Sequence, residues 1–181
     1  GDPANCHAMC EALATPERLV SPTRFTNSVH NTPAGYWHIA THSMAPSTSL
    51  AAYDASFGAG LLEAAVTCAT TGADVLLVAC DMPYPQPLHA LRPVADTMAV
   101  ALVLAPGRAA ARAPWTLHVS LSHEVAEATR CADVELEALR SGIPAARALP
   151  LLVAMASGAT ATLLLEAADG CTMQVVVEHA A

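Results

Sequence analysis

The segment from Asp54 to Ala79 constrains the fold more than any other part of the chain. Up to Thr71 it is almost entirely Ala, Leu, Val, Gly, Phe and Cys, and its few polar residues share one narrow stripe at helical spacing: Ser56, Glu63, Thr67 and Thr70. This pattern predicts a helix from Asp54 to Thr71 that is buried on most of its circumference. Gly72 is a typical C-terminal cap, and the apolar run Val75–Ala79 is typical of a central parallel strand. Together they form one α/β unit.

The residues before this helix predict a sharp junction at Asp54. Residues 46–53 are small and read as a strand, so Asp54 stands where a strand meets a helix N-terminus. Anions are stabilised at such a position and thiolates are activated there. The alternative interpretation is that Asp54 is an ordinary N-cap, for which aspartate is among the best residues. The local residues favour the N-cap interpretation and leave both open.

The rest of the first hundred residues alternates between short elements and turns. We expect a short helix over residues 3–14, a loop over 20–33 and a helix from about Pro33, with proline in its first turn. Residues 82–95 hold four prolines and have room for a short helix at most. Residues 97–104 read as a second buried strand.

The pattern changes after residue 114. Residues 115–121 alternate apolar and polar side chains, which predicts a strand with one wet face. Pro150 suits the first turn of a helix that runs to Ser157 and stops at Gly158. Strands over 160–167 and 172–178 are expected to pair as a hairpin through Asp169-Gly170, a strong turn signal.

Composition excludes several classes of function. The chain has 181 residues, a net charge of −8 and no lysine, so the basic patches that nucleic acid or anionic lipid requires are absent. No apolar run approaches the roughly 18 to 20 residues that a membrane-spanning helix requires. The six cysteines are scattered without a CxxC pair, which indicates a reducing cytoplasm. An apolar fraction of 54% leaves apolar surface for a partner.

Two groups of residues have spacings that occur in metal sites. His38 and His42 are four residues apart on an expected helix, and Cys6, His7 and Cys10 form a second group. Neither group has a further ligand in an obvious position, so we predict no metal and no cofactor. Ser56 lies in DASFG, which is not the Gly-x-Ser-x-Gly elbow of serine hydrolases.

A polar cluster precedes the helix expected at Pro33. Asn27, His30 and Asn31 either cap the loop through hydrogen bonds or line a pocket or subunit interface. The sequence leaves these two interpretations equally open.

The stretch Ala45–Ala79, APSTSLAAYDASFGAGLLEAAVTCATTGADVLLVA, resembles the nucleophile-elbow region of the β-ketoacyl synthases, which belong to the thiolase superfamily. Counting back from Gly72-Ala73-Asp74-Val75 places Asp54 where that family has its condensing cysteine. The upstream segment SPTRFTNSVHNTPAGYWHIAT, with the pair Ala34-Gly35, resembles the loop and helix that the family has at its dimer interface. The strand DTMAVALVLAP resembles the one that closes its N-terminal half.

The resemblance implies a fold and a set of site residues. We expect an α/β, thiolase-like, truncated fold with a mixed β-sheet flanked by helices and antiparallel C-terminal strands. Residues 1–181 would form a single ketosynthase-like domain, in which 1–105 is a half that lacks its first strands and 115–181 is divergent. The implied pocket or interface residues are Asn27, His30, Asn31, Gly35, Asp54 and Ser56.

Two departures from the family make independent condensation unexpected. The family takes the acyl chain on a cysteine thiolate, whereas a carboxylate at position 54 is a far weaker nucleophile towards thioesters. Its two histidine motifs are absent after residue 105, and His118, His123 and His179 lack their context. Whether the chain is an enzyme at all is therefore uncertain from sequence.

Three functions follow as hypotheses. The first is a non-condensing subunit, of the chain-length-factor type, that partners an active β-ketoacyl-ACP synthase in fatty acid or polyketide biosynthesis similar to that of aryl polyene pigments and meets the acyl carrier protein indirectly. The second is a stand-alone acyl-transfer or hydrolytic enzyme that uses Asp54 as a base. The third is a structural homodimer without an acyl ligand, which a pocket filled by side chains above Asp54 would favour.

Overall fold

The computed structural model describes residues 2–107, 113–122, 126–167 and 171–179. These residues fall into two compact units. The first comprises residues 1–50 and 84–93, and the second comprises residues 51–83 and 94–181. The prediction of a single domain stays a prediction, and each unit is treated by itself.

The first unit contains four helices. Asp2 caps the first of them, because its carboxylate accepts a hydrogen bond from the Ala4 amide at 2.8 Å. The predicted helices near residues 3–14 and from Pro33 are confirmed, but the predicted loop over 20–33 contains a further helix. Ser21 accepts from the Arg24 amide and Pro22 occupies the first turn, so the residues that suggested a turn are N-terminal helix signals. The helices are α1 (Pro3–Ala14), α2 (Pro22–Ser28), α3 (Thr32–Thr41) and α5 (Leu88–Leu91).

None of the described residues of the first unit is buried. Its large apolar side chains include Phe25, Tyr36, Trp37 and Ile39, and each is more than half exposed. Helices of 7–12 residues are marginal in water when no tertiary packing supports them. The described residues of this unit therefore form no core that could stabilise it, and its stability has to come from contacts with other surfaces.

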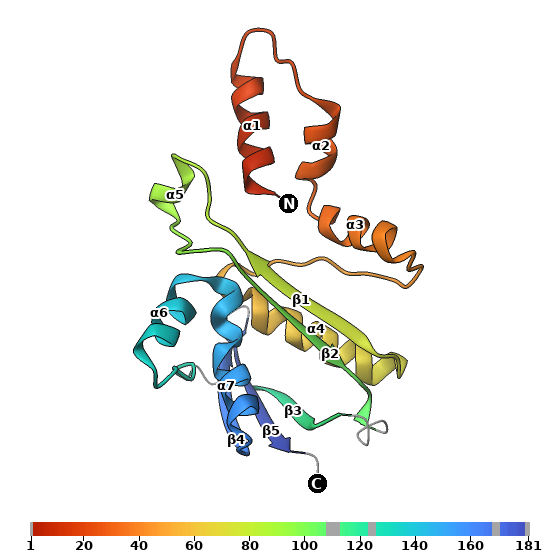
Figure 1. The fold of residues 1–181 in the computed structure, drawn as a ribbon, viewed down its shortest axis with the longest axis vertical. Coiled ribbons are helices and arrows are strands. Elements are labelled where there is room, and N and C mark those ends of the chain that lie inside the picture. The colour runs from red at the N-terminus through yellow and green to blue at the C-terminus, as the bar shows by residue number, and fades with distance from the viewer. Residues whose placement is uncertain (1, 108–112, 123–125, 168–170, 180–181) are drawn as a thin grey trace. The chain divides into compact units, whose positions relative to one another are not determined.

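The second unit holds the remaining elements (Figure 1). The helix predicted over Asp54–Thr71 is confirmed from residue 56, and Gly72 caps it with a left-handed φ of 70°. The helix after Pro150 is confirmed as well, with Gly158 as its cap. The elements are η1 (Tyr53–Ala55), α4 (Ser56–Thr71), β1 (Val75–Asp81), β2 (Met98–Leu104), β3 (Trp115–Ser122), α6 (Val134–Gly142), η3 (Pro144–Ala148), α7 (Leu149–Ser157), β4 (Ala161–Glu166) and β5 (Thr172–His179).

The strands form two antiparallel sheets in the described residues. One has the order β1-β2, with Val78 opposite Ala101, and the other has the order β3-β5-β4. The antiparallel C-terminal strands are confirmed, whereas their expected turn at Asp169-Gly170 lies outside the described residues. The expectation of a parallel neighbour for β1 is wrong within the described residues. Exposed and half-buried positions alternate along β1, so its apolar run is not a strand buried on both faces.

Helix α4 contacts both sheets. Gly60 faces Leu77 of β1, and Gly58 faces the backbone of Glu166 at the end of β4. Only one stripe of α4 is buried, so the expected burial of most of its circumference is wrong. The core around it consists of Phe57, Leu61, Val100, Ala148, Leu151, Ala154, Leu163, Leu165, Met173, Val175 and Val177.

The strand predicted over residues 46–53 is absent from the structure. This segment is described throughout and has no regular hydrogen-bonded structure up to η1. Small residues have weak strand propensity, and a strand forms only where a neighbouring strand pairs with it. The α/β class is confirmed, with antiparallel sheets flanked by helices.

Candidate functional site

The backbone turns sharply at the residue before Asp54. Tyr53 has a φ of 56°, in the left-handed region that bulky residues rarely adopt. Ser56 stabilises the turn, because its hydroxyl donates to the Tyr53 carbonyl at 2.7 Å and accepts from the Ala52 amide at 2.9 Å. Asp54 therefore lies on a strained elbow, and such strain is frequently found at functional sites.

Asp54 is not the N-cap of the buried helix. It lies inside the turn η1, and Ala55 is the N-cap residue of α4. The interpretation of Asp54 as an ordinary N-cap is therefore wrong. The part of Ser56 is to hold the elbow through two backbone hydrogen bonds.

An open groove of about 720 Å³ lies over the elbow. Its two acidic residues are Asp54, from the elbow, and Glu166, from the end of β4. The remaining lining residues are mostly alanine, which makes that part of the groove apolar. Because alanine side chains are small, they leave the groove open. The lining residues are Ala51, Ala52, Tyr53, Asp54, Ala55, Glu166 and Ala167.

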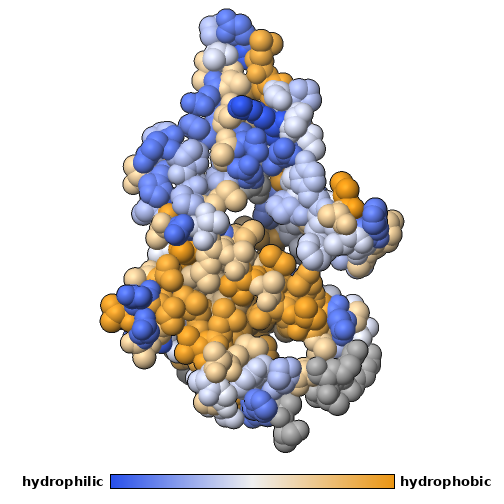
Figure 2. All heavy atoms as spheres, in the orientation of Figure 1, coloured by the Kyte–Doolittle hydropathy of each residue, from blue (hydrophilic) through white to orange (hydrophobic). Residues whose placement is uncertain are grey.

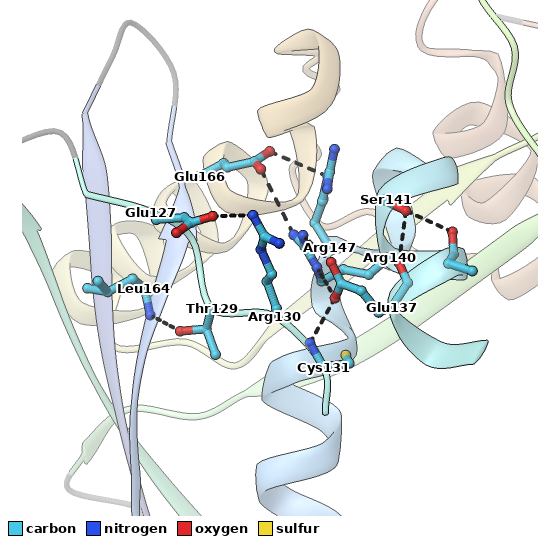
Figure 3. A network of polar contacts seen from close by, with 11 residues as sticks. Glu127, Thr129, Arg130, Cys131, Glu137, Arg140, Ser141, Arg147, Leu164 and Glu166 are labelled. Carbon is cyan, nitrogen blue, oxygen red and sulfur yellow. Dashed lines mark hydrogen bonds and ion pairs between the residues drawn. The ribbon is translucent and has the colours of Figure 1, made fainter. Parts of the chain in front are cut away.

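Two arginines hold Glu166 at the edge of this groove. Arg147 Nε lies 3.4 Å from one carboxylate oxygen, and Arg140 Nη1 lies 4.0 Å from the other. Figure 3 shows both guanidinium groups approaching the Glu166 carboxylate. The side chains of Arg140 and Arg147 are 9% and 16% exposed, whereas that of Glu166 is 37% exposed, so the two cations are largely buried and the carboxylate still reaches water.

Glu137 is the main partner of Arg140. Arg140 donates from Nε and Nη2 to the two Glu137 oxygens, at 2.7 Å each, and Glu137 also accepts from the Cys131 amide at 2.8 Å. The bidentate hydrogen bonds from Arg140, helped by the Cys131 amide, lower the pKa of Glu137 from 4.5 to about 2. Helix α6 is thereby tied to the groove through Arg140.

This pairing predicts a loss of stability in acid. A folded-state pKa below the unfolded value means that the stabilising contribution is complete above about pH 4.5 and disappears as the pH falls to about 2. We expect urea midpoints of the wild type and Glu137→Gln to differ by a constant amount above pH 4.5 and to converge by about pH 2. Glu127→Gln, at an exposed pair, is the control and should follow the wild type. A difference that persists unchanged at pH 2 would contradict this account.

The other candidate residues lie in the first unit. Asn27 accepts a hydrogen bond from the Tyr36 hydroxyl at 2.7 Å, and Asn31 is the N-cap of α3 without a side-chain cap bond. His30 is exposed, and Gly35 lies on α3 with open space where a Cβ would be. The hydrogen bond of Asn27 joins the side chains of two helices and caps no backbone group. The pocket or interface assignment of these four residues stays a prediction.

Two described histidines of the second unit, His118 and His179, have contacts on the C-terminal sheet. His118 lies 3.5 Å from Glu178, and the His179 ring packs edge-on against Trp115 with centroids 4.8 Å apart. His123 lies outside the described residues. Within the described ranges, no three His, Cys, Asp or Glu side chains are arranged to hold a metal ion. His42 is a left-handed C-cap, so it and His38 are not two positions on one helical face.

Sequence reasoning missed Glu166, Arg140 and Arg147. Each belongs to the part of the chain after residue 115, far from Asp54 in sequence. A usable signal is the glutamate that ends the otherwise apolar run of β4, because a charge at a strand end adjoining a buried core needs a partner. Chemically, the groove offers carboxylates as acceptors or bases and offers no thiolate at position 54.

Comparisons with known proteins identify a family and confirm the expected thiolase-like fold. The family model described as the N-terminal domain of beta-ketoacyl synthases matches residues 1–162. A solved structure, the ketosynthase ApeO in complex with its chain length factor ApeC from Xenorhabdus doucetiae, is similar with a TM-score of 0.67 and 23% sequence identity. The match covers 96% of this chain and 64% of the other chain. No curated protein matches.

Proposed function

The chain belongs to the family of β-ketoacyl synthase N-terminal domains, and from that membership we propose that it is a non-condensing subunit that pairs with an active ketosynthase. The observation that carries the proposal is the strained elbow at Tyr53, which presents Asp54, the residue that we place at the position of the family's cysteine. A strained elbow of this kind can present a nucleophile, but the carboxylate at position 54 is a weak one. Such a chain is suited to shaping an acyl tunnel beside a partner's active site.

The first unit supplies a surface that suits a protein partner. Between Val20 and Leu50 the only charged residue is Arg24. In the same segment Trp37 is 52% exposed and Ile39 is 71% exposed. Depletion of charge together with exposed aromatic side chains is typical of the core of a protein–protein interface. Because no residue of the first unit that the structure describes is buried, a partner surface would also stabilise its helices.

The sheet of β1 and β2 offers a second apolar surface. Figure 2 shows apolar side chains gathered over these two strands. On this face Leu76, Val78 and Val103 are 42%, 53% and 72% exposed. Because the sheet has two strands in the described residues, each strand also has an edge without a ladder partner. Uncovered edges and apolar faces favour association with another chain.

The groove supports an acyl-facing role over a purely structural one. It is open and lined largely by alanine, whereas a structural homodimer would leave it filled by side chains. We propose that the product of the pair is a fatty acid or a polyketide of the aryl polyene type, and that acyl carrier protein reaches the pair through the ketosynthase. A cytoplasmic location is supported by the six free cysteines. No helix in the described residues has the length and apolar character that a membrane crossing requires.

Co-expression with the active ketosynthase of the same organism tests the pairing. We expect a tag on either chain to retain both in equal amounts through gel filtration, and the acyl products of the pair to differ in length from those of the ketosynthase alone. A chain that elutes as a monomer or homodimer and leaves product length unchanged would contradict the proposal.

A second candidate is a stand-alone thioester hydrolase or acyl transferase. The observation in its favour is that Asp54 and Glu166 share one open groove, which would allow a carboxylate to act as a base. Purified chain should then turn over acyl thioesters unaided, and Asp54→Asn should abolish that turnover.

A further inference from the structure

A small pocket lined mainly by apolar residues lies within the first unit, beside α1 and α2. Its volume is about 260 Å³, below the roughly 300–1,000 Å³ of typical small-molecule sites. A pocket of this size suits one or two side chains of a protein better than a whole metabolite. The lining residues are Ala8, Met9, Ala12, Leu19, Val20, Ser21 and Arg24.

Arg24 is the single charged residue of the pocket lining. It is exposed on α2, and the structure gives its guanidinium no ion pair with any described carboxylate. Downstream of Arg24, to Leu50, the chain has no acidic residue, and the nearest acidic residues upstream are Glu11 and Glu17. A guanidinium presents a rigid set of hydrogen-bond donors that matches a carboxylate. The lining therefore combines apolar side chains with donors that a carboxylate of another chain could bind.

We propose that this pocket receives an apolar side chain flanked by an aspartate or glutamate on the ketosynthase subunit. The inference rests on the proposed function and makes this pocket one of the contacts between the two subunits. The apolar wall would bury the partner's apolar side chain, and Arg24 would bind the adjacent carboxylate bidentately.

Titration calorimetry between the purified chain and the purified ketosynthase of the same organism tests the assignment. We expect Arg24→Glu to weaken the affinity at least tenfold, because it places two carboxylates face to face. Ala12→Phe, which fills the pocket without changing charge, should weaken it by a similar factor. Arg18→Glu makes the same charge change outside the lining and should stay within twofold of wild type.

The outcomes separate this inference from the function on which it rests. If the wild type does not bind the ketosynthase, both are wrong. If the wild type binds and both Arg24→Glu and Ala12→Phe stay within twofold of it, the pairing stands and this pocket has no part in it. If Arg18→Glu weakens binding as much as Arg24→Glu, overall charge is responsible and the pocket assignment is wrong. Circular dichroism of each variant confirms that the helices are retained.

Discussion

Replacing Gly58 with alanine is expected to destabilise the second unit by about 3 kcal/mol or more. A Cβ at this position would lie well under 3.0 Å from the carbonyl oxygen of Glu166, a contact that real Cβ atoms essentially never show. The obstacle is backbone, so either the first turn of α4 or the end of β4 has to move. The midpoint temperature of thermal unfolding should fall by roughly 6–12 °C. Because β4 ends at the groove, the shift would also displace Glu166 relative to Asp54.

Gly60→Ala is the matched control on the same helix. Its Cβ would lie 3.1 Å from Cδ1 of Leu77, the end of a flexible side chain that can give way. Alanine also gains about 1 kcal/mol of helix propensity over glycine, which offsets the crowding. We expect the stability of Gly60→Ala to stay within about 1 kcal/mol of wild type. Equal losses in the two variants would show that α4 does not approach β4 as closely as described.

Removal of Arg140 is expected to cost about 2–4 kcal/mol. Arg140→Ala deletes both hydrogen bonds to Glu137 and leaves that carboxylate and Glu166 facing each other without the intervening cation. The loss should be measured as a lower urea midpoint with the unfolding slope unchanged. It should be larger near neutral pH than near pH 2, where Glu137 becomes protonated.

Arg130→Ala provides the matched control. Arg130 pairs with Glu127 at the same three-residue spacing, but its side chain is 65% exposed. Exposed pairs contribute little, so the change in stability should be about 0.5 kcal/mol or less. Comparable losses for Arg140→Ala and Arg130→Ala would mean that the Arg140 pair is not buried.

Local signals predicted most helices and strands. Gly72 and Gly158 end α4 and α7 in the left-handed conformation that glycine adopts without strain, as expected from their positions. Alternation predicted β3, and the hairpin strands pair antiparallel. The error at α2 arose because serine and proline serve both turns and helix starts, and Ser21-Pro22 is a helix start.

Long-range pairing could not be predicted from the chain. An apolar run such as Val75–Ala79 fits a parallel or an antiparallel neighbour, and only the partner strand decides between them. The contact that anchors η3 was equally unpredictable, because the Ala145 amide donates to Asp81, which lies 64 positions away in the sequence. Neither residue carries a local signal of that contact.

Of the candidate site, only the elbow at Asp54 could be predicted from the sequence. The register of Asp54 before Gly72 indicated the elbow, and the structure adds the strained Tyr53 and the two hydrogen bonds of Ser56. Arg140 and Arg147 lie within the residues that the family model matches, whereas Glu166 lies just beyond residue 162. Their proximity to Asp54 depends on the close contact of Gly58 with β4, which becomes apparent only once the chain is folded.

Decarboxylative condensation by the purified pair tests the central proposal most directly. The assay compares the chain alone, the pair, and the pair carrying Asp54→Asn, with acyl and malonyl groups supplied on carrier protein. The account predicts no condensation and no thioester hydrolysis by the chain alone, full condensation by the pair, and a rate within twofold for Asp54→Asn. Turnover by the chain alone, or loss of condensation in the Asp54→Asn pair, would contradict a non-condensing role.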